Sequence, residues 1–290
     1  MPKLSIGSWA FAFGPFENVL KFAADAGYDG VEINGFRPHP HQDDYNSPQK
    51  CRELMNIIGG YGLGVSGYAP DFAAAPPAVA PREGYLGIFR KCLDFCVNCG
   101  INVLRVDTVS PPVALSENEY NDNFARLAKT WNAAAAEAER AGVLLVWEFE
   151  PGFWLNKPSE VVALVNAVAH ENFRVLFDTS HAYMGAVVGA RHTGEKQILP
   201  GGIVEYAKML EKHIGHFHLI DSDGTLHDET TSTHTPFGQG QVDFPAFISA
   251  FAPMLKALPW WCVDFCFCAE AEKYGREGLV YLKRFMEGII

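Results

Sequence analysis

The chain has no apolar run long enough to cross a bilayer, and its start lacks the basic segment, hydrophobic stretch and small-residue cleavage site of a signal peptide. Positive charge is also scarce: 23 lysines and arginines stand against 34 aspartates and glutamates, a net charge of -11. This balance repels the phosphate backbone of nucleic acids. We therefore expect a cytoplasmic protein that binds neither membranes nor nucleic acids and acts on a small polar metabolite.

Cysteine is sparse and odd in number, with seven residues in a 290-residue chain. Three cysteines recur at i, i+4 and i+7 in a helical pattern, and three surround a predicted strand. They are Cys92, Cys96 and Cys99, and Cys262, Cys266 and Cys268. Both groups are interpreted as reduced, buried thiols, because zinc-thiolate sites usually combine short C-x₂₋₄-C turns with a partner pair.

Strand and helix signals alternate along the whole sequence. The predicted strands cover 4–11, 30–34, 65–68, 103–109, 143–150, 173–178, 215–221 and 260–267. The predicted helices cover 16–26, a segment beginning at 47–48, 85–99, 117–140, 157–170, 203–214, 244–258 and 271–286. A Gly-rich loop over 184–201 and a polar loop over 222–243 are also expected.

Eight such units predict a closed parallel barrel, an α/β fold of the (β/α)8 TIM type that forms a single domain over 1–290. An open doubly wound sheet is the alternative. It has less support, because neither G-x-G-x-x-G nor G-x-x-x-x-G-K-[ST] follows the first strand to hold a nucleotide. In a barrel, the chemistry lies at the carboxyl ends of the strands.

Ionisable side chains occur at those strand ends. Strand 215–221 carries His216 and His218 on one face, and three other strands end in carboxylates. The carboxylates are Glu148 and Glu150, Asp178, and Asp264. Converging buried carboxylates need a cation, and this oxygen-rich set with one imidazole suits Mn²⁺ or Mg²⁺, with Co²⁺, Zn²⁺ or Fe²⁺ as further options. The alternative is a structural ion-pair network with Arg105, Arg174 and Lys212.

Three segments resemble one family, the sugar isomerase/epimerase superfamily of xylose isomerase-like barrels, and within it the ketose 3-epimerases and keto-inositol dehydratases. Asp178-Thr179-Ser180-His181 is similar to its D-T-x-H motif, and Gly215-His216-Phe217-His218-Leu219 to its G-H-x-H-L segment. The segment from Pro236 to Phe244 resembles its P-x-G-x-G signature.

The resemblance implies a metal held by Glu148, Asp178, His218 and Asp264, with manganese as the first expectation. It also implies that His181 contacts substrate oxygen and that His216 lies one layer deeper. Glu148 is chosen over Glu150 because Glu148-Phe149-Glu150-Pro151-Gly152 is similar to an E-x-H-P-G pattern whose first Glu binds metal.

The sequence departs from the epimerase pattern at three positions. Asp264 stands where a Glu is usual, Gly224 where an Arg follows the metal-binding His, and Trp154 where a second Glu is expected. Metal binding therefore has more support than any particular sugar.

The predicted function is a divalent-metal-dependent isomerase or epimerase of a small sugar or keto-sugar. The metal would stabilise an enediolate, while Glu148 and Asp264 act as catalytic base and acid on its two faces. A lyase or dehydratase acting on a keto-inositol or 3-keto-glycoside shares this intermediate and is the alternative. A non-catalytic subunit of a sugar-processing complex and a DNA-repair endonuclease are further alternatives, the latter opposed by the acidic charge.

Further residues are predicted with less specific signals. Glu32, Glu150 and Trp154 join His181 as candidate substrate-binding residues, and His227 and His234 are expected to be solvated in the polar loop. Aromatic residues near strand ends, such as Trp9, suit stacking on a sugar. The aromatic content is compatible with a homo-oligomer.

Overall fold

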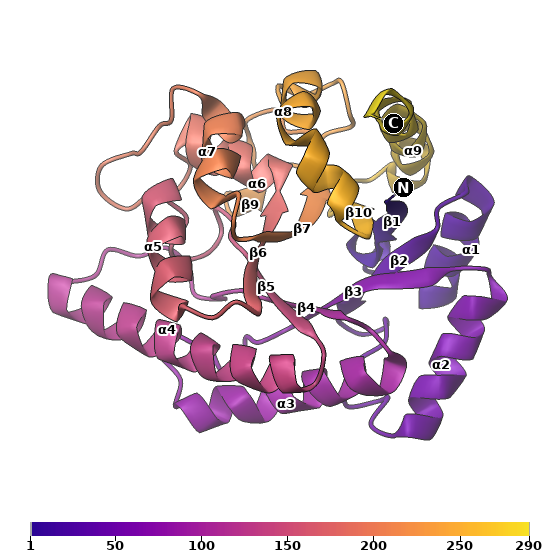
Figure 1. The fold of residues 1–290 in the computed structure, drawn as a ribbon, viewed down its shortest axis with the longest axis horizontal. Helices are drawn as coiled ribbons and strands as arrows, with labels where there is room; N and C mark the ends of the chain where they lie inside the picture. Colours follow the sequence, from indigo (N-terminus) through magenta and orange to yellow (C-terminus); the bar gives the residue numbers. More distant parts are fainter. Residues whose placement is uncertain (1, 290) are drawn as a thin grey trace.

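In the computed structural model, which describes residues 2–289, eight parallel strands form a closed barrel surrounded by helices (Figure 1). The order around the barrel is β1-β10-β7-β6-β5-β4-β3-β2. The strands are β1 (Lys3–Gly7), β2 (Gly30–Gly35), β3 (Gly64–Pro70), β4 (Val103–Val106), β5 (Leu144–Glu148), β6 (Phe173–Asp178), β7 (Ile214–Leu219) and β10 (Trp260–Val263). The predicted (β/α)8 barrel is confirmed, and the open sheet is excluded because β1 pairs with both β2 and β10.

The helices around the barrel begin and end at local signals. They are α1 (Phe16–Ala26), α2 (Pro48–Gly60), α3 (Arg82–Cys99), α4 (Glu117–Arg140), α5 (Pro158–Val168), α6 (Thr179–Tyr183), α7 (Gly202–Leu210), α8 (Phe244–Ala257) and α9 (Ala271–Ile289). At the start of α4, Ser116 and Glu119 form a reciprocal capping box. Helix α1 ends at Gly27, which adopts a left-handed φ of 91° that glycine tolerates at little cost.

Several strands end earlier than the sequence predicted. β1 stops at Gly7 and is followed by a 3₁₀ turn, η1 (Ser8–Phe11), while β5 stops at Glu148 and β10 at Val263. Glu150 and Asp264 therefore lie in the loops just beyond their strands. The consequence is functional, because these loops surround the mouth of the barrel.

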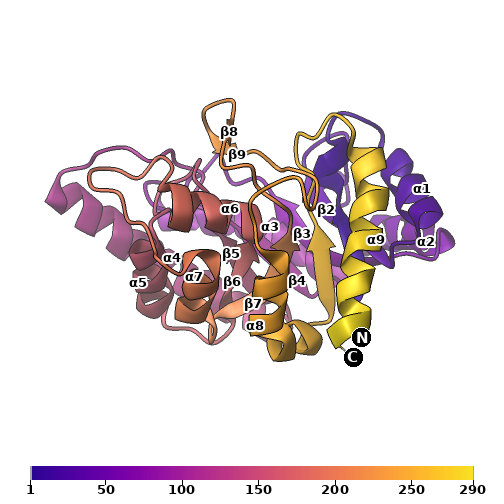
Figure 2. The same ribbon diagram turned by 90° about the horizontal axis from the view of Figure 1, so that it is seen from above.

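The two long loops contain more structure than expected. Residues 184–188 form a π-helical turn, η2 (Met184–Val188), that continues α6. The predicted polar loop contains a short hairpin of β8 (Leu226–His227) and β9 (Thr231–Ser232), which projects from the barrel in Figure 2. A buried carboxylate anchors the segment that follows, because Asp221 accepts backbone N–H groups from Gly238, Gly240 and Val242. A Cβ at Gly240 would lie 2.3 Å from Asp221, which explains the glycine in this motif.

The cysteines follow the prediction, with partial exceptions at the barrel mouth. Cys92, Cys96 and Cys99 are buried free thiols on the inner face of α3, and Cys262 is buried on β10. Cys266 and Cys268 are only partly buried. Within residues 2–289, the helices include none that is long and apolar enough to span a bilayer. The cytoplasmic location stays a prediction.

Candidate active site

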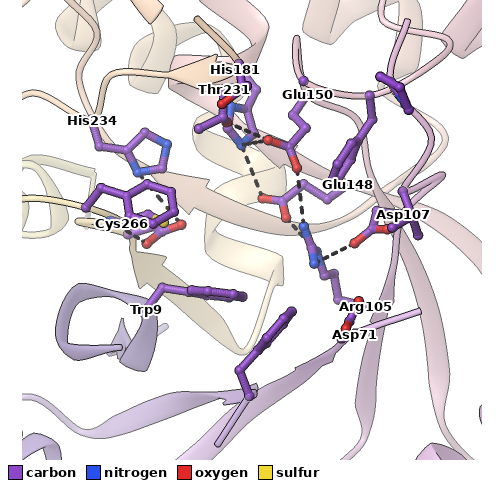
Figure 3. Close-up of a pocket in the computed structure, with 18 of the residues that line it drawn as sticks. Trp9, Asp71, Arg105, Asp107, Glu148, Glu150, His181, Thr231, His234 and Cys266 are labelled. Atoms are coloured by element: carbon purple, nitrogen blue, oxygen red, sulfur yellow. Dashed lines mark hydrogen bonds and ion pairs between the residues drawn. The ribbon is translucent and has the colours of Figure 1, made fainter. Parts of the chain in front are cut away.

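A cavity of about 460 Å³ opens at the carboxyl ends of the barrel strands. This volume falls within the range of small-molecule sites. Figure 3 shows charged side chains converging on its floor, with Arg105 between carboxylates and His181 and His234 on the opposite side. Its lining includes Trp9, Phe36, Asp71, Arg105, Asp107, Val109, Glu148, Glu150, Phe153, His181, Arg191, Thr231, His234, Asp264, Cys266 and Phe267.

The four residues predicted as metal ligands come together at and directly beneath this floor: Glu148 and Asp264 line the cavity, and His218 and Asp178 lie behind them. His218 Nδ1 lies 2.9 Å from Glu148 Oε1, 3.8 Å from Asp178 Oδ2 and 3.6 Å from Asp264 Oδ2. They come from four strands or the residues directly after them, and all are buried. The convergence follows from the barrel topology, which places the carboxyl ends of β5, β6, β7 and β10 side by side.

Three of these ligand atoms, Glu148 Oε1, Asp178 Oδ2 and His218 Nδ1, are buried and make no well-aligned hydrogen bond with any residue in 2–289, although Glu148 Oε1 and His218 Nδ1 face each other at 2.9 Å. One ligand atom from each of these three residues lies within 4.8 Å of the other two. Buried polar atoms are normally paired, and an orphan carries a cost of about 1–3 kcal/mol. Buried ligand atoms that lie this close together without other partners fit a shared cation.

The other ring nitrogen of His218 is fixed by a carboxylate. Glu32 on β2 accepts from His218 Nε2 at 2.7 Å and from His216 Nε2 at 2.8 Å. Glu32 thereby favours a proton on Nε2, and Nδ1 is the nitrogen that faces Glu148, Asp178 and Asp264. Carboxylates of this kind commonly orient metal-binding imidazoles.

This geometry changes the predicted role of Glu32. It does not line the cavity but lies beneath it, 3% exposed, as the partner of both histidines. This place suits a positioning role for Glu32 in place of the predicted contact with substrate, and His216 lies in the same deeper layer.

Arg105 on β4 is the principal cation of the cavity floor. Its guanidinium lies 2.6 Å from Glu148, 2.7 Å from Asp107 and 3.7 Å from the Glu150 carboxylate. The sequence-based alternative placed Arg174 and Lys212 in an ion-pair network as well. Neither lines the cavity, and the Arg174 guanidinium instead donates to the backbone oxygen of Lys212.

Burial and neighbouring charges shift the pKa values of the carboxyls in different directions. Burial opposes the charge of Glu148, but Arg105 and His218 outweigh it and hold the pKa of Glu148 well below its usual value. Burial raises the pKa of Asp264 to about 6 and that of Glu150 to about 7. Burial and the nearby Glu148 carboxylate raise the pKa of Asp178 well above its usual value. The neighbouring protein groups therefore do not fully neutralise the negative charges of ionised Asp178 and Asp264.

Two histidines border the floor from the side of the hairpin. His181 is hydrogen-bonded through Nδ1 to Ser232, and its Nε2 lies 3.9 Å from Glu148 and 4.0 Å from Glu150. His234 was expected to be solvated, and that prediction is wrong, because the residue is 6% exposed and its ring lies 5.3 Å from that of His181. Burial lowers the pKa of His234 to about 4. His227 remains partly exposed, as expected for the loop.

Trp154 does not reach the cavity. It is buried behind the β5 loop, where its ring packs edge-on against Tyr120 at 5.5 Å. Its predicted contact with substrate therefore has no structural support, since the side chain fills the space between α4 and this loop. Gly224 likewise lies outside the lining, at a φ of 80°.

The cavity contains a second guanidinium that sequence reasoning missed. Arg191 follows η2 and borders the cavity, and its Nη1 is within 3.4 Å of the Gly152 carbonyl oxygen. The epimerase pattern has an Arg where this chain has Gly224, and Arg191 supplies a positive group from a different loop. Arg191 lies in a Gly-rich loop, where no helix or strand periodicity predicts the direction of a side chain.

Comparison with known proteins identifies the family. A model of the xylose isomerase-like TIM barrel matches residues 20–277. The chain belongs to this family. Fructoselysine 3-epimerase of Escherichia coli O157:H7 is 24% identical over 238 residues, 79% of this chain and 78% of that protein.

Solved structures share the fold at low identity. A D-tagatose 3-epimerase-like protein superposes with a TM-score of 0.75 and 18% identity, covering 99% of this chain and 100% of that one. The 3-keto-D-glucoside 4-epimerase of E. coli superposes with a TM-score of 0.69 and 13% identity, covering 98% and 100%. These structures show the shared fold; with the family match and the epimerase relative, the chain is a sugar isomerase/epimerase-like enzyme whose type of reaction stays open.

Proposed function

We propose that this enzyme is a divalent-metal-dependent epimerase or isomerase of a keto-sugar. The observation that carries the proposal is the group of orphaned ligand atoms on Glu148, Asp178 and His218, with Asp264 beside them. The curated relative acts as a 3-epimerase of fructoselysine, which supports a keto-sugar as the substrate class.

Glu148, Asp178, His218 and Asp264 would hold the ion, and their three carboxylates and one imidazole suit Mn²⁺ first, with Mg²⁺, Co²⁺, Zn²⁺ or Fe²⁺ as further options. A bound divalent ion would act as a Lewis acid toward the carbonyl oxygen of a ketose and favour loss of the neighbouring proton. Nδ1 of His218, which Glu32 orients through Nε2, and the buried carboxylate oxygens of Glu148 and Asp178 fit this role.

The chain's own groups account for the movement of the proton. Glu148 and Asp264 lie 2.9 Å and 3.6 Å from the same nitrogen, His218 Nδ1, and come from β5 and from the end of β10, which β6 and β7 separate in the barrel. A carbon held between them can lose a proton to one carboxylate and receive a proton from the other on its opposite face. His181 Nε2 and the Arg105 guanidinium face the same space and can bind substrate oxygens.

Elimination is the second candidate, and Glu150 favours it. This carboxyl borders the cavity at the position where the resembling E-x-H-P-G pattern has His, and it accepts a hydrogen bond from Thr231. An additional carboxyl near the reacting carbons can protonate a departing hydroxyl or glycosidic oxygen. The same loss of the first proton would then yield dehydration instead of epimerisation.

The test is isotope exchange in D₂O with metal-loaded enzyme, followed by proton NMR. The panel contains free ketoses, keto-inositols and 3-keto-glycosides. We expect loss of one C–H signal in one class, and the product formed distinguishes inversion, isomerisation and elimination. Elemental analysis of the same protein is expected to find a stoichiometric divalent ion that is lost in His218→Ala. Absence of exchange and elimination across the panel, with the metal bound, contradicts the proposal.

Glu32→Gln tests the metal site without relying on turnover. A neutral amide holds the two histidine protons less firmly, and a lost orienting carboxylate typically weakens metal affinity by about 10–100-fold. We expect that loss in a chelator competition measured with Mn²⁺. Glu171→Gln, on an exposed position, is the matched control and should bind as the unchanged protein does. Equal affinity in the two variants would show that Glu32 does not orient His218.

A further inference from the structure

An outer cavity of about 570 Å³ adjoins the catalytic cavity. Trp9 and Phe267 line both, so these two side chains form their shared wall. Figure 3 shows Trp9 at the edge of the catalytic cavity, on the far side of the floor from Glu150. A ligand held on the catalytic floor can therefore extend past this wall without leaving the protein surface.

The outer cavity presents aromatic rings to solvent. Phe13 is 92% exposed and Phe267 is 46% exposed, although large apolar side chains are usually buried. The rings of His227 and Phe267 stack at 4.6 Å with an angle of 8° between their planes. Together with Phe11 and Trp9, they offer flat apolar surface beside a charged floor.

The backbone at Phe267, which carries one of these rings, is strained. Its φ of 60° lies in the left-handed region, which costs a bulky residue about 1–2 kcal/mol. The strained residue does not fill the core, since its side chain is half exposed between the two cavities. Strain of this kind is retained mainly where function requires it.

The charges of the outer cavity restrict what can enter. Its charged lining residues are Asp228 and Glu272, and its described lining includes no lysine or arginine. A phosphate or carboxylate would lack a partner there and would be repelled. A flat, uncharged ring gains instead from stacking on aromatic side chains, by about 0.5–1.5 kcal/mol per pair beyond the burial of its area.

We infer that the outer cavity is a subsite for an uncharged aromatic substituent, so that the substrate is a keto-sugar carrying an aryl group and not a free ketose. This inference rests on the proposed function for the sugar end of the substrate. The sugar occupies the catalytic cavity, and the aryl group crosses Trp9 to lie against Phe267.

The test compares two stable probes, phenyl β-D-glucopyranoside and methyl β-D-glucopyranoside, by calorimetric titration of the metal-loaded enzyme. We expect the phenyl glycoside to bind about tenfold more tightly. Phe267→Ala should remove most of this preference, which is measured as the ratio of the two affinities because Phe267 also borders the catalytic cavity. Phe13→Ser, at an almost fully exposed position that cannot affect folding through burial, should reduce the preference in part. Ile57→Ala, an exposed apolar position on α2, is the control.

Equal affinity for the two probes, or a phenyl preference that survives in Phe267→Ala, overturns the inference. A second copy of this chain could also cover the outer cavity, and light scattering tests this. If Phe267→Ala dissociates an oligomer and leaves the phenyl preference intact, the surface is an interface between copies of this chain. The probes need no proton transfer, so a phenyl preference without exchange or elimination on any keto-sugar of the panel, 3-keto-glycosides included, contradicts the proposed function alone. Exchange on a free ketose with equal binding of the probes contradicts the subsite alone.

Discussion

Replacing Glu148 by Gln is expected to lower the rate of deuterium exchange by about 10²–10⁴-fold for the epimer whose proton Glu148 removes, the usual contribution of a positioned general base or acid. The amide keeps the size of the side chain but cannot accept a proton at the position of Oε1. The measurement is single-turnover exchange in D₂O, with the metal content determined on the same sample. Glu139→Gln, on the exposed side of α4, should exchange at the normal rate.

Asp264→Asn sharpens this experiment, because the two carboxylates would serve opposite faces of one carbon. Starting from either epimer, one variant should lose the first proton transfer and the other the second. The variant that retains the first transfer is then expected to exchange deuterium without inverting the carbon. Identical behaviour of both variants with both epimers would contradict the assignment of one carboxylate to each face.

Local signals made the helices predictable from the sequence. The bounds predicted for α1 and α4 agree with the structure, because both have apolar residues at helical spacing, Gly27 ends α1 and a capping box at Ser116 begins α4. Strand ends were less accurate at β1 and β10. A parallel strand ends where its neighbours stop pairing, and those neighbours lie far away in the sequence.

The four candidate ligands were recognised because each stands at the end of an apolar strand, and Glu148, Asp178 and His218 also lie within motifs. The role of Glu32 could not be found in this way, since its partner His218 is 186 residues away. His234 lies in a stretch rich in polar residues, which suggested a solvated loop. Its burial arises from the β8–β9 hairpin and the packing of its ring on His181, and neither has a periodic signal.

The position of Arg105 shows how a buried cation can organise the catalytic floor. The sequence placed it on a strand with Asp107 but could not show that its guanidinium also contacts Glu148. With a side chain only 10% exposed, it is screened by little water, and so its charge acts strongly on its neighbours. It thereby holds Glu148 in one orientation while leaving Oε1 directed toward His218 Nδ1.

Arg105→Met is expected to destabilise the protein by about 3–5 kcal/mol, because it removes one partner of a buried ion pair and leaves Asp107 and Glu148 without their cation. The measurement is urea unfolding without added metal, where the midpoint should fall by about 1 M or more. Arg105→Lys keeps the charge but loses the planar fork that reaches two carboxylates at once, so an intermediate loss is expected. Arg126→Met, at an exposed site on α4, is the matched control. If Arg105→Met unfolds at the same urea concentration as this control, the network does not stabilise the fold, and any loss of turnover in that variant would then come from the contact of Arg105 with substrate.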